Sequence, residues 1–174
     1  MKVYLRPIKK SDTENVLKWR NHPSVRSNFV FQDDLTTKAH ESWLNDNVNT
    51  GKAAQFIIVS EELGDVGTVY LRDIDNRHRK AEFGIFIGEV LARGKGFGAE
   101  AARLILEHAF CTLNLNKVFL RVFNDNINAI KSYELAGFTK EGYFAEDVII
   151  NDRPYDMVFM AILRSQYEKD RSGV

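Results

Sequence analysis

The sequence predicts an α/β protein of the α+β type, with one mixed, mostly antiparallel sheet of about seven strands and helices on both faces. Two observations predict this class. Short runs rich in β-branched and aromatic residues alternate with longer amphipathic segments, in the order β-α-α-β-β-β-α-β-α-β-β. No internal repeat, low-complexity tract or linker divides the 174 residues, so we expect a single domain over residues 1–174.

The first half of the chain carries four strands and two helices. Their expected ranges are 3–8 (strand), 11–21 and 36–48 (helices), and 55–60, 66–71 and 80–87 (strands). The first helix begins with the capping-box sequence Ser-Asp-Thr-Glu at residues 11–14. It ends before Pro23, because the residue preceding a proline is disfavoured in the α region. The segment between the helices carries Phe29 and Phe31, which could line a small-molecule pocket.

The second half continues with two helices and three strands. The expected ranges are 97–113 and 126–136 (helices), and 117–123, 146–150 and 155–163 (strands). Gly137 is a natural C′ residue for the second of these helices. In the strand expected at residues 80–87, KAEFGIFI, alternation places residues 82, 84 and 86 on one face and residues 81, 83, 85 and 87 on the other.

Composition excludes several function classes. The 24 basic residues balance the 24 acidic ones, so net charge indicates neither a nucleic-acid nor a membrane partner. The single Cys111 cannot form an internal disulfide, no stretch approaches the roughly 20 apolar residues that span a bilayer, and the first residues do not resemble a signal peptide. We therefore expect a cytoplasmic protein. The four histidines show no ligand spacing, so we expect no metal site.

Residues 91–102, LARGKGFGAEAA, place Gly94, Gly96 and Gly98 between a strand and a helix. The first amides of a helix have no internal partner and lie at the positive end of its dipole. Glycine permits positive φ and leaves room for an anion, and Arg93 and Lys95 add positive charge. A tight turn alone could also use glycine, but the combination favours an anion site.

Two phosphate-binding motifs fit this loop poorly. A Walker A loop requires Ser or Thr after Gly-Lys, whereas Gly96 follows Lys95. The dinucleotide fingerprint G-x-G-x-x-G/A is formally met by Gly94, Gly96 and Ala99. However, that fingerprint usually opens a βαβ half, and here several strands and helices precede it. A dinucleotide-binding protein is therefore only a minor alternative.

A third pattern fits better. Residues 93–98, RGKGFG, match the R/Q-x-x-G-x-G/A signature of the GCN5-related N-acetyltransferases, and residues 126–138, NINAIKSYELAGF, are similar to that superfamily's second motif. The opening LRPIKKSD and residues 140–143 resemble the branch of ribosomal-protein N-terminal acetyltransferases. Residues 19–23 resemble nucleotide-linked amino-sugar N-acetyltransferases of the pseudaminic acid pathway, and residues 75–83 resemble spermidine N-acetyltransferases.

This resemblance implies the GNAT fold and an acetyl-CoA-dependent N-acetyltransferase. The expected reaction is direct attack, in a ternary complex, by a primary amine of a small molecule: an amino sugar, a nucleotide-linked amino sugar or a polyamine. N-terminal acetylation of a ribosomal protein is one alternative, and a non-catalytic acyl-CoA-binding module is another. A homodimer is plausible because related proteins often pair.

The transfer needs two proton movements. An alkyl amine with a pKa of about 10.4 must lose a proton before it attacks, and the departing thiolate must gain one. The resemblance places the general acid at Tyr133, whose alternative role is a packed helix tyrosine. Glu82 is the candidate base, because desolvation beside a core strand can tune a carboxylate. Its alternative role is a salt bridge with Arg72, Arg79 or Lys80.

The remaining candidates are binding residues. We expect acetyl-CoA to contact Ile87, Gly88, Arg93, Gly94, Lys95, Gly96, Phe97, Gly98, Ala99 and Asn126. Among these, the backbone of Ile87 and Gly88 is expected to bond the pantetheine arm, and Asn126 is also a good N-cap candidate. The acceptor is expected near Trp19, Arg20, Phe29 and Phe31. A polycationic acceptor would require an acidic pocket, for which the candidates are Asp33, Asp34, Glu146 and Asp147.

Overall fold

The computed structural model describes residues 2–172, with side chains through residue 169. Its elements are β1 (Val3–Pro7), η1 (Lys10–Asp12), α1 (Thr13–Asn21), α2 (Pro23–Arg26), α3 (Thr37–Trp43), η2 (Leu44–Val48), β2 (Ala54–Ser60), β3 (Gly64–Asp75), β4 (Lys80–Ile87), η3 (Val90–Ala92), α4 (Phe97–Glu107), η4 (His108–Thr112), β5 (Lys117–Phe123), α5 (Ile127–Leu135), β6 (Thr139–Ile150), β7 (Arg153–Leu163) and α6 (Arg164–Ser172).

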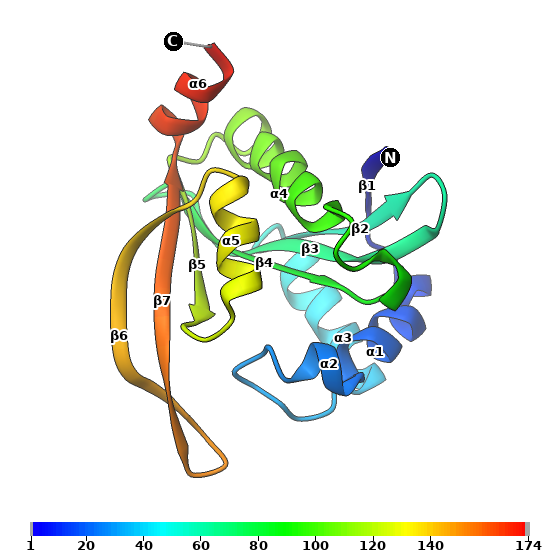
Figure 1. Ribbon diagram of the computed structural model, residues 1–174. Helices are drawn as coiled ribbons and strands as arrows, with labels where there is room; N and C mark the ends of the chain where they lie inside the picture. Colours follow the sequence, from blue (N-terminus) through cyan, green and yellow to red (C-terminus); the bar gives the residue numbers. More distant parts are fainter. Residues whose placement is uncertain (1, 173–174) are drawn as a thin grey trace.

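The seven strands form one sheet in the order β1-β2-β3-β4-β5-β7-β6. All neighbouring strands are antiparallel except β4 and β5, which are parallel. Helices α4 and α5 cover one face of the sheet, and α1, α2 and α3 lie on the other (Figure 1). The predicted mixed sheet with helices on both faces is therefore confirmed.

The sheet opens in its middle. Strands β4 and β5 pair over only three residues, from Lys80 opposite Lys117 to Glu82 opposite Phe119. Beyond that point β4 stays with β3 as far as Ile87, while β5 stays with β7 as far as Phe123. The two strands thus form a V with Glu82 at its closed end.

The alternation predicted for β4 is confirmed. Ala81 and Phe83 belong to the main core, together with the apolar face of α4. Phe86 instead packs against the smaller core that contains Trp19 of α1. Because the strand alternates, Glu82 lies on this second face, the one opposite α4 and α5.

Some local expectations were wrong. Helix α1 begins at Thr13, and the turn before it is closed by Asp12 rather than Ser11. The Asp12 carboxylate accepts a hydrogen bond from the Lys9 amide at 2.8 Å and also pairs with Arg6, so the capping carboxylate serves a tertiary ion pair as well. Strand β6 is longer than expected, because its pairing with β7 begins at Thr139.

Candidate active site

A cavity of about 570 Å³ occupies the V between β4 and β5. It is lined by these strands, by β3, by α5 and by the segment 24–31. Helix α5 and the segment 24–31 lie on opposite faces of the sheet (Figure 1). Because residues from both line the cavity, it connects the two faces. Seven of the predicted site residues line it: Phe29, Phe31, Glu82, Ile87, Arg93, Asn126 and Tyr133.

Tyr133 lies on the α4 and α5 side of the cavity. Its ring packs edge to face against Phe83 and Phe138, with centroid distances of 5.8 and 6.1 Å. Its hydroxyl makes no protein hydrogen bond among the described residues, and burial raises the pKa of this tyrosine. Tyr133 is thus both a packed helix residue and a protonated hydroxyl available in the cavity.

Asn126 is the N-cap of α5, as its sequence position indicated. Its side-chain oxygen accepts a hydrogen bond from the Ala129 amide at 3.2 Å. Its amide nitrogen donates to Asn28 Oδ1 at 3.0 Å, which ties the start of α5 to the segment 24–31. Capping and cavity lining are therefore combined in one residue.

The glycine loop ends at the N-terminus of α4. Gly94 and Gly96 have φ of +72° and +82°, and a Cβ at either would meet nothing within 4 Å. Backbone conformation, not crowding, therefore requires glycine there. Gly96 is the N-cap, and the first helical hydrogen bond runs from Glu100 N–H to the Gly96 carbonyl. The earlier amides, of Phe97, Gly98 and Ala99, consequently point out of the helix end.

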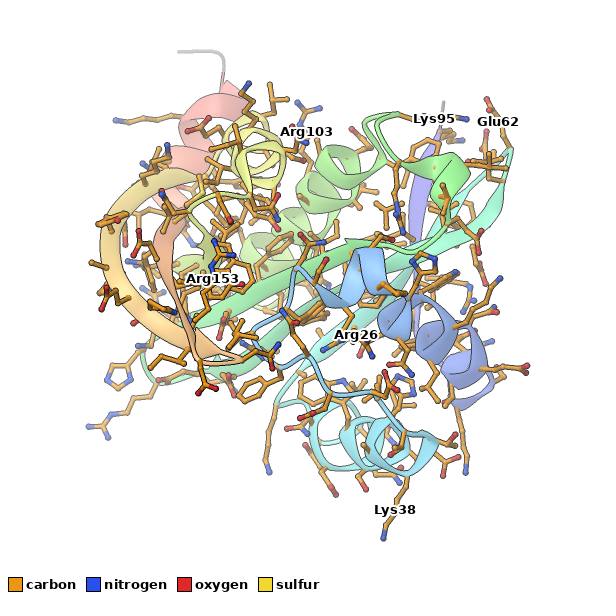
Figure 2. All side chains as sticks on the ribbon, turned by 60° about the horizontal axis from the view of Figure 1, so that its bottom comes forward. Arg26, Lys38, Glu62, Lys95, Arg103 and Arg153 are labelled. Atoms are coloured by element: carbon orange, nitrogen blue, oxygen red, sulfur yellow. The ribbon has the colours of Figure 1, made fainter. Side chains whose placement is uncertain are left out.

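This geometry fits a pyrophosphate. Free amides, the positive end of the helix dipole and open space above two glycines are what an anion needs. Lys95 is exposed on this loop and extends from its outer side (Figure 2). Phe97, in contrast, is buried in the core and anchors the loop, so only its amide faces outward.

The Arg93 side chain bonds mainly to other parts of the protein and not to the glycine loop. Its guanidinium donates to the carbonyls of Ile87 and Gly88, both at 3.2 Å, and to Ser24 Oγ at 2.8 Å. These bonds join the end of β4 to α2. The expected contact between Arg93 and an anion can therefore use only the guanidinium N–H groups that these three bonds leave unengaged.

Gly88 has a different role from the one expected. Its amide donates to the Val66 carbonyl at 2.9 Å, and its own carbonyl accepts from Arg93. A Cβ there would lie 2.0 Å from Trp19 Cγ, so glycine is required for packing. Because Gly88 bonds toward β3, alternation turns the main-chain groups of Ile85 and Ile87 toward the open side of the V. The Ile87 carbonyl already accepts from Arg93, so the groups that can bond an extended ligand are the Ile87 amide and the main chain of Ile85.

Two predicted acceptor residues do not line the cavity. Trp19 is 3% exposed in the smaller core, and its indole N–H donates to Glu89 at 2.7 Å, so the structure gives its expected acceptor contact no support. Arg20 lies behind the cavity wall, with its guanidinium 3.9 Å from the ring centroid of Phe29. Phe29 also packs against Phe86 at 5.7 Å. Arg20 therefore supports a lining residue.

Glu82 forms the salt bridge that its sequence context left open. Arg72 donates two hydrogen bonds to the carboxylate, at 2.8 and 3.2 Å. The Arg121 Nε lies 3.7 Å from the same Oε1 that accepts the shorter of these bonds. The Glu82 side chain is 12% exposed, so this is a largely buried pair with a second arginine beside it.

Sequence reasoning missed Tyr70, Arg72 and Arg121 as cavity residues. Tyr70 and Arg72 lie opposite Gly84 and Glu82 in the β3–β4 ladder. A Cβ at Gly84 would lie 2.2 Å from Tyr70 Cζ, which shows that the tyrosine ring crosses the glycine. A glycine inside a strand and an arginine inside the apolar run KVFLRVF were the available signals. We call the part of the cavity lined by Phe29, Tyr70, Arg72, Glu82 and Arg121 the acceptor chamber.

Across residues 2–172, no three His, Cys, Asp or Glu side chains are grouped so that they could hold a metal ion. Within the same range, no helix has both the length and the apolar character needed to cross a membrane.

Comparison with known proteins agrees with the geometry. Residues 2–139 match the family described as acetyltransferase (GNAT) domain. Spermidine N(1)-acetyltransferase of Vibrio cholerae is 30% identical over 163 residues, covering 94% of each chain, and that of Escherichia coli is 32% identical over 165 residues, covering 95% of this chain and 88% of the relative. The crystal structure of spermidine N-acetyltransferase from Vibrio cholerae in complex with CoA and spermine gives a TM-score of 0.88 at 30% identity, covering 95% of this chain and 98% of that chain.

Proposed function

Because this chain belongs to the GNAT family of acetyltransferases, we propose that the opening between β4 and β5 is its active site. The chain is an acetyl-CoA-dependent N-acetyltransferase for a primary amine of a small molecule. The observation that supports the site is the meeting of three features in one cavity: the free edge of β4, Arg93 at the start of the glycine loop, and Tyr133.

The residues present fit acetyl-CoA, which supplies a thioester acetyl group when bound. The amides at the start of α4 and the Lys95 side chain would hold its pyrophosphate. The main-chain groups of Ile85 and Ile87 would bond its pantetheine arm where β4 has left β5. Asn126, at the start of α5, lines the same cavity and offers a further polar contact.

Tyr133 is proposed as the general acid. A tyrosine is protonated at neutral pH, and burial raises the pKa of this one further. It can therefore hold a proton at the point where the thiolate departs and release it as negative charge develops. The hydroxyl has no protein partner among the described residues, so nothing there competes for that proton.

Glu82 is proposed to position the arginines of the acceptor chamber. Its lone pairs are engaged by Arg72, and Arg121 is next to it, which leaves limited capacity to take a proton from an amine. The attacking amine would instead lose its proton to water in the cavity. This assignment chooses the second of the two roles that the sequence left open.

A thiol-release assay tests the proposal. Purified protein is mixed with acetyl-CoA and a panel of amines, and free CoA is measured with a chromogenic disulfide. Spermidine belongs in the panel because the relatives are named for it, and amino sugars and an N-terminal peptide complete it. Amine-dependent release that is lost in Tyr133→Phe supports the assignment. No release with any amine would favour the acyl-CoA-binding module.

We also infer a cytoplasmic enzyme that forms a homodimer. A single cysteine and no membrane-crossing helix among the described residues support the cytoplasmic location.

The long edge strand β6 supports the homodimer, because its side chains Tyr143, Phe144 and Ile149 are 57%, 47% and 73% exposed. Light scattering of the purified chain would measure the mass, and a monomer at micromolar concentration would contradict the dimer.

A further inference from the structure

The charges of the acceptor chamber are unbalanced. Arg72 and Arg121 enter it from β3 and β5, and Glu82 is the only carboxylate among its lining residues in the described chain. That carboxylate already accepts two hydrogen bonds from Arg72. Arg72 has a second carboxylate nearby, since Asp73 Oδ2 lies 3.9 Å from its Nε, but the Asp73 side chain is 81% exposed and does not line the cavity. The lining itself therefore keeps an excess of positive charge.

Arg121 carries most of this excess. Its Nε is 3.7 Å from Glu82 Oε1, beyond hydrogen-bond range, and its side chain is 45% exposed. The arginine lies on the face of β5 that looks away from α4, because its neighbours Leu120 and Val122 belong to the main core. Apart from this longer ion pair with Glu82, the guanidinium has no hydrogen-bond acceptor among the described residues, so its fork of donors is available in the chamber.

Arg20 adds positive charge behind the chamber wall. Its Nη1 is buried and has no hydrogen-bond partner among the described residues. Its guanidinium lies 3.9 Å from the centroid of the Phe29 ring, which lines the chamber. Its Nη2 donates to the Phe31 carbonyl, and Asp34 contributes electrostatic attraction, but a desolvated charge is still costly and a nearby anion would reduce that cost.

The acidic residues considered for a polycationic acceptor are elsewhere. Asp33, Asp34, Glu146 and Asp147 do not line the cavity, and Asp34 pairs with Arg26. A polyamine would bring several positive charges to a chamber that already has an excess of them. Electrostatics therefore opposes the acceptor named for the relatives.

We propose that the acceptor is an acidic amine: a small molecule that carries a phosphate or carboxylate group in addition to the amine, with Arg121 binding that group. A guanidinium fork matches both anions with two parallel hydrogen bonds. This inference rests on the proposed function, since it concerns the acceptor of the same site. It predicts that binding the anion fixes the position of the amine relative to Tyr133.

The test compares three amino sugars that share the glucosamine unit and differ in charge, with spermidine as the polyamine. Thiol release is measured with saturating acetyl-CoA and with glucosamine, glucosamine 6-phosphate, muramic acid or spermidine. The second and third compounds add a phosphate and a carboxylate to the first, so they distinguish the two anions. We expect kcat/KM at least about tenfold higher for one or both acidic sugars than for glucosamine, since charge-assisted hydrogen bonds contribute on that scale.

Variants locate the effect. In Arg121→Gln the ratio of kcat/KM for the preferred acidic sugar to that for glucosamine should fall about tenfold, and Arg121→Lys should retain part of it. Arg103→Gln is the matched control, because Arg103 lies on α4 across the sheet from the chamber, and it should keep the wild-type ratio. A second readout needs no turnover: with CoA bound, glucosamine 6-phosphate should raise the Tm of the wild type more than that of Arg121→Gln.

The outcomes separate the two proposals. Release that is fastest with spermidine, and no faster with either acidic sugar than with glucosamine, would overturn the acidic acceptor and leave the acetyltransferase intact. An unchanged ratio in Arg121→Gln would overturn the role of Arg121. Absence of release with every amine, together with no difference in Tm, would overturn both.

Discussion

The rings of Tyr133 and Phe83 meet edge to face, with centroids 5.8 Å apart and planes inclined by 84°. Phe83 is the first residue of β4 after its pairing with β5 has ended. The contact therefore fixes α5 against the strand at the point where the sheet opens. It positions a tyrosine hydroxyl in the opening by packing alone, without a hydrogen bond to the protein among the described residues.

Tyr133→Phe should keep this packing and remove the proton. We expect kcat to fall about 100-fold, in the usual range for losing a general acid, with the Kd of acetyl-CoA unchanged. Because burial raises the pKa of Tyr133, the loss should be the same from pH 6.5 to pH 9. Tyr143→Phe, on the exposed strand β6, is the control and should retain full activity. An active Tyr133→Phe enzyme would remove Tyr133 from the mechanism.

Gly96→Ala should weaken the binding of acetyl-CoA. Its φ of +82° is unfavourable for alanine by about 1–2 kcal/mol, so the loop would relax away from the conformation that directs its amides outward. Gly51→Ala is a matched control, because Gly51 has φ of +75°, equally open surroundings and a position outside the site. Calorimetric titration with acetyl-CoA should show a Kd about tenfold higher for the first variant only. Equal Kd values in both variants would exclude the loop as the pyrophosphate site.

Gly84→Ala should disturb the acceptor chamber through Tyr70. The added Cβ would lie 2.2 Å from Tyr70 Cζ, so the ring must move. We expect a loss of about 1–3 kcal/mol in the free energy of unfolding and a higher KM for the acceptor. In a Tyr70→Ala background the same substitution should cost much less, and this coupling is measured by a double-mutant cycle in urea. Additive effects would mean that Tyr70 does not constrain Gly84.

Glu82→Gln distinguishes positioning from base catalysis. If Glu82 orients Arg72 and Arg121, the variant should raise the KM of the acceptor, reduce kcat less than about tenfold and leave the shape of the pH–rate profile unchanged. Steady-state kinetics from pH 6 to pH 9 provide the measurement. A loss of about 100-fold or more in kcat, together with disappearance of the acidic limb, would restore Glu82 as the base.

The order of the seven strands and of α1, α3, α4 and α5, and the glycine loop, were readable from local patterns, whereas α2 and α6 were not expected. Alternation in β4 correctly separated Phe83 from Glu82, and the cap at Asn126 followed from its residue type and position. These features depend on neighbours in sequence. The start of α1 was misplaced because the Asp12 carboxylate also binds Arg6, a tertiary contact that overrides the local capping pattern.

The acceptor chamber depended on register, which the sequence does not show. Arg72 meets Glu82 only because a hairpin places β3 opposite β4, and Arg121 reaches it only because a distant strand pairs with the start of β4. Trp19 lies in the core, away from the cavity, for a related reason. Its neighbours in the core come from other elements, including the glycine that follows β4.

The buried His40 predicts how stability depends on pH. It is 2% exposed, its Nδ1 lies 3.0 Å from Thr13 Oγ1, and burial lowers its pKa. The unfolded chain therefore binds a proton near the ordinary pKa of 6.5, whereas the folded protein resists until a lower pH. The stability that neutral His40 contributes is therefore complete above pH 6.5, and it is lost as the pH falls from there through the lower pKa of the folded protein. Urea unfolding measures the free energy of unfolding at pH 7.5 and at pH 5.5. Between these two values it should fall less in His40→Gln than in the wild type or in the exposed control His78→Gln. His108, whose pKa burial also lowers, should account for part of the loss that remains, so equal losses in all three proteins would show that His40 does not contribute.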